Sequence, residues 1–198
     1  MRTLVAQRDR LKRIRIFLGI GLADVLLPEH ADAFDFLAYC GSGSNRTLAR
    51  AGVLDILPVH YSQLPGLIRD GRFRIDVVML QVSPPDEHGR YSLGLAREYL
   101  VEAVKHARAI IAEVHPDVPW TYGGPYFRAT DIDLLVASDT SFPDAPAVAP
   151  GPVEQAIGRH VASLVDDGAT LQTGIGSIPD AVMAELNDKR DLGVHRVA

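Results

Sequence analysis

The chain has 198 residues and a mass of 21.5 kDa, enough for one domain with a sizeable core or for half of a larger enzyme. Hydrophobic residues make up 47% and charged residues 23%, and this ordinary globular composition excludes a disordered or fibrous chain. The net charge of −5 argues against nucleic acid as a partner, and no apolar run reaches the length of a membrane span.

Cysteine usage and the N-terminus predict a cytoplasmic location. Cys40 is the one cysteine, so no internal disulfide can form, which is compatible with a reducing cytosol. The first residues carry charges but no apolar stretch followed by a small-residue cleavage site, so no signal peptide is evident. We therefore expect a soluble cytoplasmic protein that binds neither nucleic acid nor membrane.

Short aliphatic runs alternate along the chain with longer amphipathic stretches, a rhythm that predicts an α/β fold with a mainly parallel sheet covered by helices. The strand-like runs are largely apolar instead of alternating, as in strands covered on both faces. The predicted strands, in chain order, are 14–18, 36–39, 56–59, 77–82, 110–114, 134–136 and 170–172. The predicted helices are 45–51, a short helix capped by Ser62, 96–107, 152–165 and 180–186.

Residues 142–152 hold four prolines between a predicted strand and a predicted helix. Proline cannot donate to a β ladder, and it favours an extended conformation in the residue before it. We expect a loop or linker here, of the kind that could join two lobes.

A glycine turn follows the last predicted strand, and its free N–H groups at a helix start could hold an anion or an oxyanion. A dinucleotide-binding fingerprint would need a third glycine where Pro179 stands, so that interpretation fails. The alternative is a tight strand-to-helix turn that binds nothing. The residues of this turn are Gly174, Ile175, Gly176, Ser177 and Ile178.

A polar loop follows the predicted strand 77–82, where ligands of open parallel sheets bind. Asp86 and His88 could do acid–base work or bind a metal, but no partner ligands complete a metal set. The alternative is a proline-stiffened turn in which the aspartate and the histidine fix the backbone. The candidate residues of this loop are Ser83, Asp86, His88 and Gly89.

A third polar segment, Gly41–Arg46, also follows a predicted strand. It could hold a phosphate with the help of Arg46, but it lacks the Gly-Lys-Ser/Thr of a P-loop and the Gly-x-Ser-x-Gly of a hydrolase elbow. Ser44 as a plain helix N-cap is the simpler interpretation.

Two blocks of sequence, taken together, resemble the acetyl-CoA hydrolase/transferase family, of the 4-hydroxybutyrate CoA-transferase type. The first block is Asp76–Gly89 followed by Ser92-Leu93-Gly94, and the second is Asp166–Val182 continuing to Asp191–His195. The resemblance implies that 1–198 is a CoA-transferase N-terminal-type domain, truncated at both ends.

The resemblance also implies a reaction in which CoA moves from an acyl-CoA to a small carboxylate such as acetate. A glutamate attacks the thioester, and the glycine turn 174–178 binds CoA and stabilises the oxyanion. Coenzyme A is then a substrate, so no permanently bound cofactor and no metal is expected. The loop with Ser83, Asp86, His88 and Gly89 is expected near the substrate.

At the position of the family's nucleophilic glutamate this chain has Val197, and valine cannot attack a thioester. We therefore expect no catalytic residue in this chain, no turnover by the chain alone, and a partner chain that supplies a C-terminal lobe. We also expect a homo-oligomer, because apolar surface that family members cover internally would be left exposed in this chain. The alternative is a non-catalytic CoA-binding or interaction remnant. An independent hydrolase using Asp86 and His88 is disfavoured, because no nucleophile is paired with them.

Overall fold

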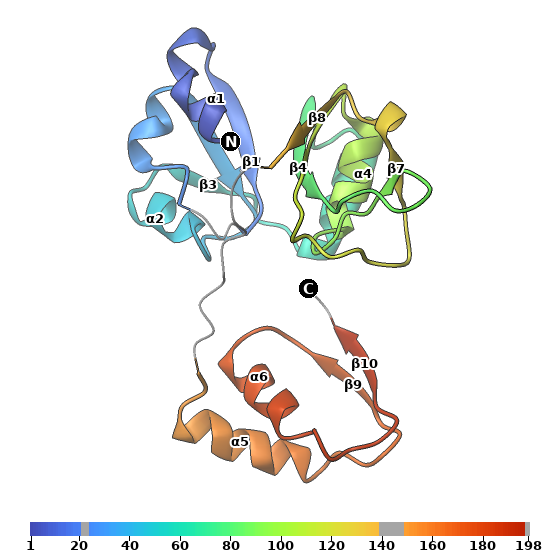
Figure 1. Cartoon of the computed structure of the whole chain (residues 1–198). Coiled ribbons are helices and arrows are strands. Elements are labelled where there is room, and N and C mark those ends of the chain that lie inside the picture. Colours follow the sequence, from blue (N-terminus) through green and yellow to red (C-terminus); the bar gives the residue numbers. More distant parts are fainter. Residues whose placement is uncertain (21–23, 139–148, 197–198) are drawn as a thin grey trace. The chain divides into compact units, whose positions relative to one another are not determined.

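The computed structural model describes residues 1–20, 24–138 and 149–196. They form two compact units, Met1–Asp144 and Ala145–Ala198 (Figure 1). Of the predicted proline-rich segment 142–152, residues 142–148 lie outside the described part of the chain.

The first sheet of the N-terminal unit is parallel and has the order β1-β2-β3. Its strands are β1 (Ile14–Leu18), β2 (Phe34–Ala38) and β3 (Leu54–Ile56), with helices α1 (Arg2–Ala6) and α2 (Asn45–Arg50) and the 3₁₀ turns Arg8–Arg10 and Pro28–Asp32. Phe34 and Phe36 are buried because alternate residues of β2 point to one face, where they pack with Leu48 of α2.

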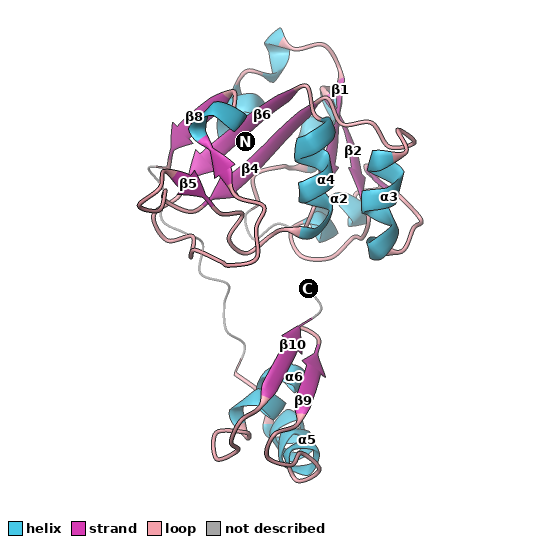
Figure 2. Ribbon diagram, turned by 90° about the vertical axis from the view of Figure 1, so that its right-hand side faces the viewer, coloured by secondary structure: helices cyan, strands magenta, loops and turns pink. Residues whose placement is uncertain are grey.

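The second sheet of this unit is also parallel and has the order β4-β6-β8. Its strands are β4 (Val77–Val82), β6 (Ala109–Val114) and β8 (Leu134–Ala137). Helix α4 (Glu98–His106) connects β4 to β6 and packs beside α3 (Leu64–Arg69), which follows a 3₁₀ turn at Tyr61–Gln63 (Figure 2). Ala103 and Val104 of α4 are buried against this sheet together with Ile68 of α3.

A short antiparallel pair brings the loops after β4 and β6 together. It joins β5 (Arg90–Tyr91) to β7 (Phe127–Arg128), which a 3₁₀ turn at Ala129–Asp131 follows. This pair matters for the site, because the segments next to both strands line a cavity described below.

The other face of the β4-β6-β8 sheet remains open within this unit. Val77 and Met79 of β4 alternate with buried residues and are exposed, as are Leu134 and Val136 of β8. Helices thus flank these parallel strands as predicted, but among the described residues of this unit they cover this sheet on one face.

The C-terminal unit contains a parallel β-α-β motif preceded by a helix. Its elements are α5 (Pro152–Ala162), β9 (Thr170–Thr173), α6 (Ser177–Ala184) and β10 (Gly193–Arg196). Ala162, Val182 and Leu186 form its core with Val165. Helices α5 and α6 approach closely at Gly158, where an added Cβ would lie 2.7 Å from the Ala181 carbonyl oxygen.

The predicted mainly parallel α/β architecture is confirmed, and several predicted boundaries are wrong for local reasons. The strand predicted at 56–59 ends at Ile56, because Pro58 cannot donate to the ladder. The helix predicted at 180–186 begins three residues earlier, at Ser177, because Pro179 is tolerated in the first turn, where N–H groups have no helical partner. Ser62 does not cap a helix; it lies inside the 3₁₀ turn.

Candidate functional site

The loop after β4 is fastened to the segment after β5 through Ser83. The side chain of Ser83 is fully buried, its Oγ accepts the backbone N–H of Ser92 at 3.0 Å, and its own N–H binds the Ser92 carbonyl at 3.0 Å. Ser83 Oγ in turn donates to the Pro84 carbonyl. Ser83 therefore holds the backbone of Ser92 in place. Ser92 in turn lines the cavity described below.

Asp86 organises the turn that leads into β5. Its Oδ1 accepts the backbone N–H groups of His88 and Arg90, and its Oδ2 lies 2.7 Å from an Arg90 guanidinium nitrogen. Partial desolvation raises the pKa of the Asp86 carboxyl, but the hydrogen bonds from the Arg90 guanidinium and the two N–H groups outweigh it and lower the pKa. The Asp86 carboxyl is therefore ionised, and it holds the backbone of the turn in place.

His88 and Gly89 occupy the outside of the same turn. The His88 side chain is 62% exposed, and its Nε2 lies 3.6 Å from a carboxylate oxygen of Glu87, not from Asp86. Gly89 has a φ of +70°, which a glycine adopts without strain. The structure thus does not join Asp86 and His88 into an acid–base pair: the aspartate binds the histidine's backbone, and the imidazole faces solvent.

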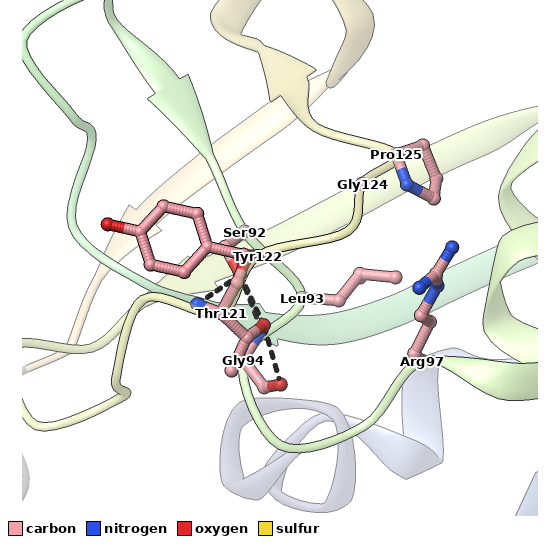
Figure 3. Close-up of a pocket in the computed structure, with 8 residues that line it drawn as sticks. All are labelled: Ser92, Leu93, Gly94, Arg97, Thr121, Tyr122, Gly124 and Pro125. Carbon is pink, nitrogen blue, oxygen red and sulfur yellow. Dashed lines mark hydrogen bonds between the residues drawn. The ribbon is translucent and has the colours of Figure 1, made fainter.

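A cavity of about 180 Å³ lies between the segments that flank β5 and β7 (Figure 3), and we call it the Arg97 cavity. One side is lined by Ser92, Leu93, Gly94 and Arg97, and the other by Thr121, Tyr122, Gly124 and Pro125. Sequence reasoning missed most of these residues. The available signal was position, because the loops after β4 and β6 follow the carboxyl ends of adjacent parallel strands.

Arg90 also stabilises the second wall of this cavity. Its guanidinium carbon lies 5.0 Å from the centre of the Tyr126 ring, and that ring stacks on Trp120. The Tyr126 hydroxyl accepts the backbone N–H of Gly123 at 3.1 Å. Asp86 therefore acts on the cavity wall through Arg90 and Tyr126.

A cluster of aromatic rings lies beside α4. Phe17, Tyr39, Tyr61 and Tyr99 are in ring contact, and the Tyr61 hydroxyl donates to the Glu98 carboxylate. Burial raises the pKa of Tyr99 to about 12, with the charges of Tyr39 and Glu98 adding to it; burial and the Glu98 hydrogen bond also raise the pKa of Tyr61. These phenols stay protonated near neutral pH and cannot serve there as bases.

The glycine turn of the C-terminal unit exposes its backbone at the start of α6. Gly176 occupies the N-cap with φ 128° and ψ 175°, a conformation that is essentially restricted to glycine. A Cβ added at Gly174 or Gly176 would meet no atom within 4 Å, and Ile175 and Ile178 are exposed. Ser177 is the first residue of the helix. The turn is thus open enough for a ligand to approach its N–H groups.

The segment Gly41–Arg46 is held in place by Asn45. The Asn45 amide is buried and donates to the carbonyls of Gly19 and Cys40, which joins the ends of β1 and β2. Ser44 does occupy the N-cap of α2, but its side chain makes no capping hydrogen bond.

The described part of the chain contains neither a metal-binding cluster nor a membrane-spanning helix. Its residues include no group of three or more His, Cys, Asp or Glu side chains arranged to hold a metal ion. None of its helices combines the length and the apolar character that crossing a bilayer requires.

Comparison with known proteins agrees with the fold. Residues 1–145 match the family described as acetyl-CoA hydrolase/transferase N-terminal domain. The 4-hydroxybutyrate coenzyme A transferase of Clostridium kluyveri is 39% identical over 77% of this chain and 36% of its own length. The succinyl-CoA:cyclohexane-1-carboxylate CoA transferase of Geobacter metallireducens is 33% identical over 98% of this chain and 45% of its own length.

Solved structures give the same result. RipA from Yersinia pestis matches 98% of this chain and 47% of its own, with a TM-score of 0.86 and 28% identity. The 4-hydroxybutyrate CoA-transferase of Porphyromonas gingivalis matches 98% of this chain and 45% of its own, with a TM-score of 0.70 and 30% identity. The chain spans less than half the length of these relatives. Because the family match covers most of its residues, the chain belongs to the acetyl-CoA hydrolase/transferase family.

Proposed function

We propose that the chain is the N-terminal half of a CoA-transferase that moves CoA between an acyl-CoA and a carboxylate such as acetate. The observation that carries this proposal is similarity along almost the whole chain to proteins named as CoA transferases. Relatives from Geobacter metallireducens, Anaerostipes caccae and Syntrophomonas wolfei each align with 97–98% of it. Their names pair CoA thioesters with carboxylates, and coenzyme A is accordingly a substrate in this proposal.

In this function the glycine turn Gly174–Ile178 binds CoA. Its support is the open backbone at Gly174 and Gly176, together with the unpaired N–H groups and partial positive charge where α6 begins. Backbone donors of this kind stabilise negative charge that develops on an attacked thioester oxygen. The loop with Ser83, Asp86, His88 and Gly89 lies near the substrate in this proposal, with Ser83 and Asp86 fixing the cavity wall.

The chain by itself has no transferase turnover in this proposal, because Val197 takes the place of the family's nucleophilic glutamate. Val197 lies outside the described residues and is known here from the sequence alone. The test is an assay of the purified chain with acetyl-CoA, propionyl-CoA or butyryl-CoA and carboxylate acceptors. Transfer well above background contradicts this part of the proposal, whereas slow hydrolysis does not, because water needs no such glutamate.

A second candidate, a non-catalytic CoA-binding or interaction remnant, is favoured by the same valine. The two candidates differ in what a C-terminal lobe with a nucleophilic glutamate would do. A transferase half, which we also propose to be homo-oligomeric, gains CoA transfer when that lobe and the glutamate are supplied, on the same polypeptide or on a partner chain. A remnant binds CoA or a protein under the same conditions and gains no activity.

A further inference from the structure

The Arg97 cavity contains a guanidinium whose charge has no counter-ion in the described structure. Arg97 is the residue before α4; it is exposed to solvent and lines the open side of the cavity. In the part of the chain that the structure describes, no carboxylate oxygen lies within 4.0 Å of its guanidinium. The acidic groups closest in sequence are otherwise engaged: Glu98 accepts a hydrogen bond from Tyr61, and Glu102 binds Lys105.

Glycine at position 123 makes room for this guanidinium. A Cβ added at Gly123 would lie 3.3 Å from Arg97 Nη1, and the φ of +99° disfavours any other residue there. The Arg97 side chain extends from the turn before α4 toward the segment with Gly124 and Pro125 (Figure 3). The guanidinium therefore lines the cavity beside a wall that Tyr126 holds in place.

Two hydroxyl groups of the cavity wall, those of Ser92 and Thr121, are already paired with each other and with the backbone. Ser92 Oγ accepts the N–H groups of Gly94 and Thr121, at 3.0 and 3.1 Å, and Thr121 Oγ1 donates to the Gly94 carbonyl at 3.0 Å. Leu93 and Pro125 add apolar surface. A ligand that suits this lining carries one negative charge for Arg97 and an apolar remainder.

From these features we propose that the Arg97 cavity binds a small organic acid, with its carboxylate on the Arg97 guanidinium and its carbon chain against Leu93 and Pro125. Guanidinium and carboxylate match in planar geometry and form charge-assisted hydrogen bonds. The cavity volume of about 180 Å³, on the order of six water molecules, suits an acid of a few carbons. In CoA transfer this cavity would be the place of the acceptor carboxylate, and that part of the assignment rests on the proposed function.

The test is an NMR titration of the full chain with sodium butyrate, with butyramide as the uncharged analogue of similar size. We expect butyrate to bind with a dissociation constant on the order of 1 mM and butyramide at least tenfold more weakly. Arg97→Gln, which removes the charge and shortens the side chain but keeps a polar end, weakens butyrate binding at least tenfold. Arg72→Gln is the matched control, because Arg72 is an exposed arginine after α3 that does not line the cavity, and it leaves binding unchanged.

Circular dichroism of each variant confirms that it is folded before the titration is interpreted. Equal binding of butyrate by wild type and folded Arg97→Gln overturns the assignment, as does binding of inorganic phosphate as tight as that of butyrate. If Arg97→Gln does not fold, Arg97→Lys is compared with wild type instead. Lysine keeps the charge but lacks the planar guanidinium, so this variant should bind butyrate more weakly than wild type.

The proposal and the proposed function can fail separately, because butyrate binding is measured without CoA. Arg97-dependent binding in a chain that never supports CoA transfer upholds the cavity assignment and counts against the transferase role. When a C-terminal lobe and the glutamate are supplied, CoA transfer to butyrate whose KM for butyrate is unchanged by Arg97→Gln upholds the transferase role and overturns the cavity assignment.

Discussion

The carboxyl group of Asp86 binds two backbone N–H groups and one guanidinium, so its charge is used to hold a turn in shape. Those bonds lower the pKa of Asp86 in the folded chain. The carboxyl therefore contributes stability that is present above the pKa of an unfolded aspartate, about 3.9, and is lost as the pH falls through the lower folded value.

We expect Asp86→Asn to lower the thermal unfolding midpoint at pH 7, because the amide keeps the shape but loses the ion pair with Arg90. The gap between wild type and variant should begin to narrow as the pH falls below about 4, where the carboxyl of the unfolded chain takes up a proton, and should close as the pH falls through the lower folded pKa. Circular dichroism melts across this pH range measure both midpoints. A gap of constant size from pH 7 to pH 3 would show that charge is not the source of the effect.

Gly176 and Gly174 look equivalent in the sequence, but their backbones differ. Gly176 has a φ of +128°, so a side chain there strains the backbone whether or not a ligand binds. Gly174 does not lie in that region, and a Cβ added there meets no atom within 4 Å. Gly174 is therefore the position at which added volume tests ligand access alone.

We expect wild type to bind CoA weakly, with a dissociation constant on the order of 0.1–1 mM, and Gly174→Val to lose this binding while it stays folded. Gly176→Ala should instead lower the free energy of unfolding by about 1–3 kcal/mol, because alanine must adopt a conformation that L-residues avoid. Calorimetry with CoA and denaturant unfolding separate the two effects. Undiminished CoA binding by Gly174→Val would mean that the turn only connects the strand to the helix and does not bind CoA.

At the scale of elements, apolar runs and helical periodicity were sufficient to predict most of the fold. The strands 14–18 and 77–82 were predicted to the residue, because these mainly apolar runs are bounded by polar residues or glycine. The short strands β5 and β7 were missed, since two-residue strands carry no periodic signal.

The candidate site was less accessible from sequence than the fold. Asp86 and His88 are two residues apart in the sequence, yet the imidazole faces solvent and the carboxylate faces the backbone. Arg97 and Gly123 line or border one cavity although 26 residues separate them, and no local motif connects them. The direction of the side chains and the pairing of distant segments decide both cases. Neither can be predicted from the spacing of the residues in the sequence.

The close contact between α5 and α6 reverses the usual expectation for a glycine-to-alanine change at Gly158 in a helix. Alanine is the better helix former by about 1 kcal/mol, but its Cβ would lie 2.7 Å from the Ala181 carbonyl oxygen. We expect Gly158→Ala to lower the free energy of unfolding by about 1–3 kcal/mol, because the two helices must separate. Denaturant unfolding followed by circular dichroism measures the change.

Gly66→Ala in α3 is the matched control, because a Cβ at Gly66 meets no atom within 4 Å. It should raise the free energy of unfolding by about 0.4–1 kcal/mol. Fluorescence of Trp120, the one tryptophan, reports on the N-terminal unit and should follow Gly66→Ala but not Gly158→Ala. A stabilised Gly158→Ala would show that the helices tolerate the added methyl group.

At the scale of the whole molecule, the open face of the β4-β6-β8 sheet predicts self-association. Within the N-terminal unit, Val77 and Met79 of β4 and Leu134 and Val136 of β8 are exposed apolar residues on the two strands that flank β6, and apolar surfaces of this kind drive association. We expect light scattering at micromolar concentration to give a mass above the 21.5 kDa of one chain. Met79→Lys with Leu134→Lys should reduce that mass, and a wild-type monomer would contradict this prediction.

The central claim, that this chain is one half of a CoA-transferase, is tested most directly by restoring the missing nucleophile. The measurement is the rate of acetyl-CoA formation from butyryl-CoA and acetate, for wild type and Val197→Glu, each supplied with the C-terminal half of the Clostridium kluyveri relative. The account predicts background rates for wild type and clear transfer for Val197→Glu. Equal rates for the two chains, or none with a soluble and folded Val197→Glu complex, would contradict it.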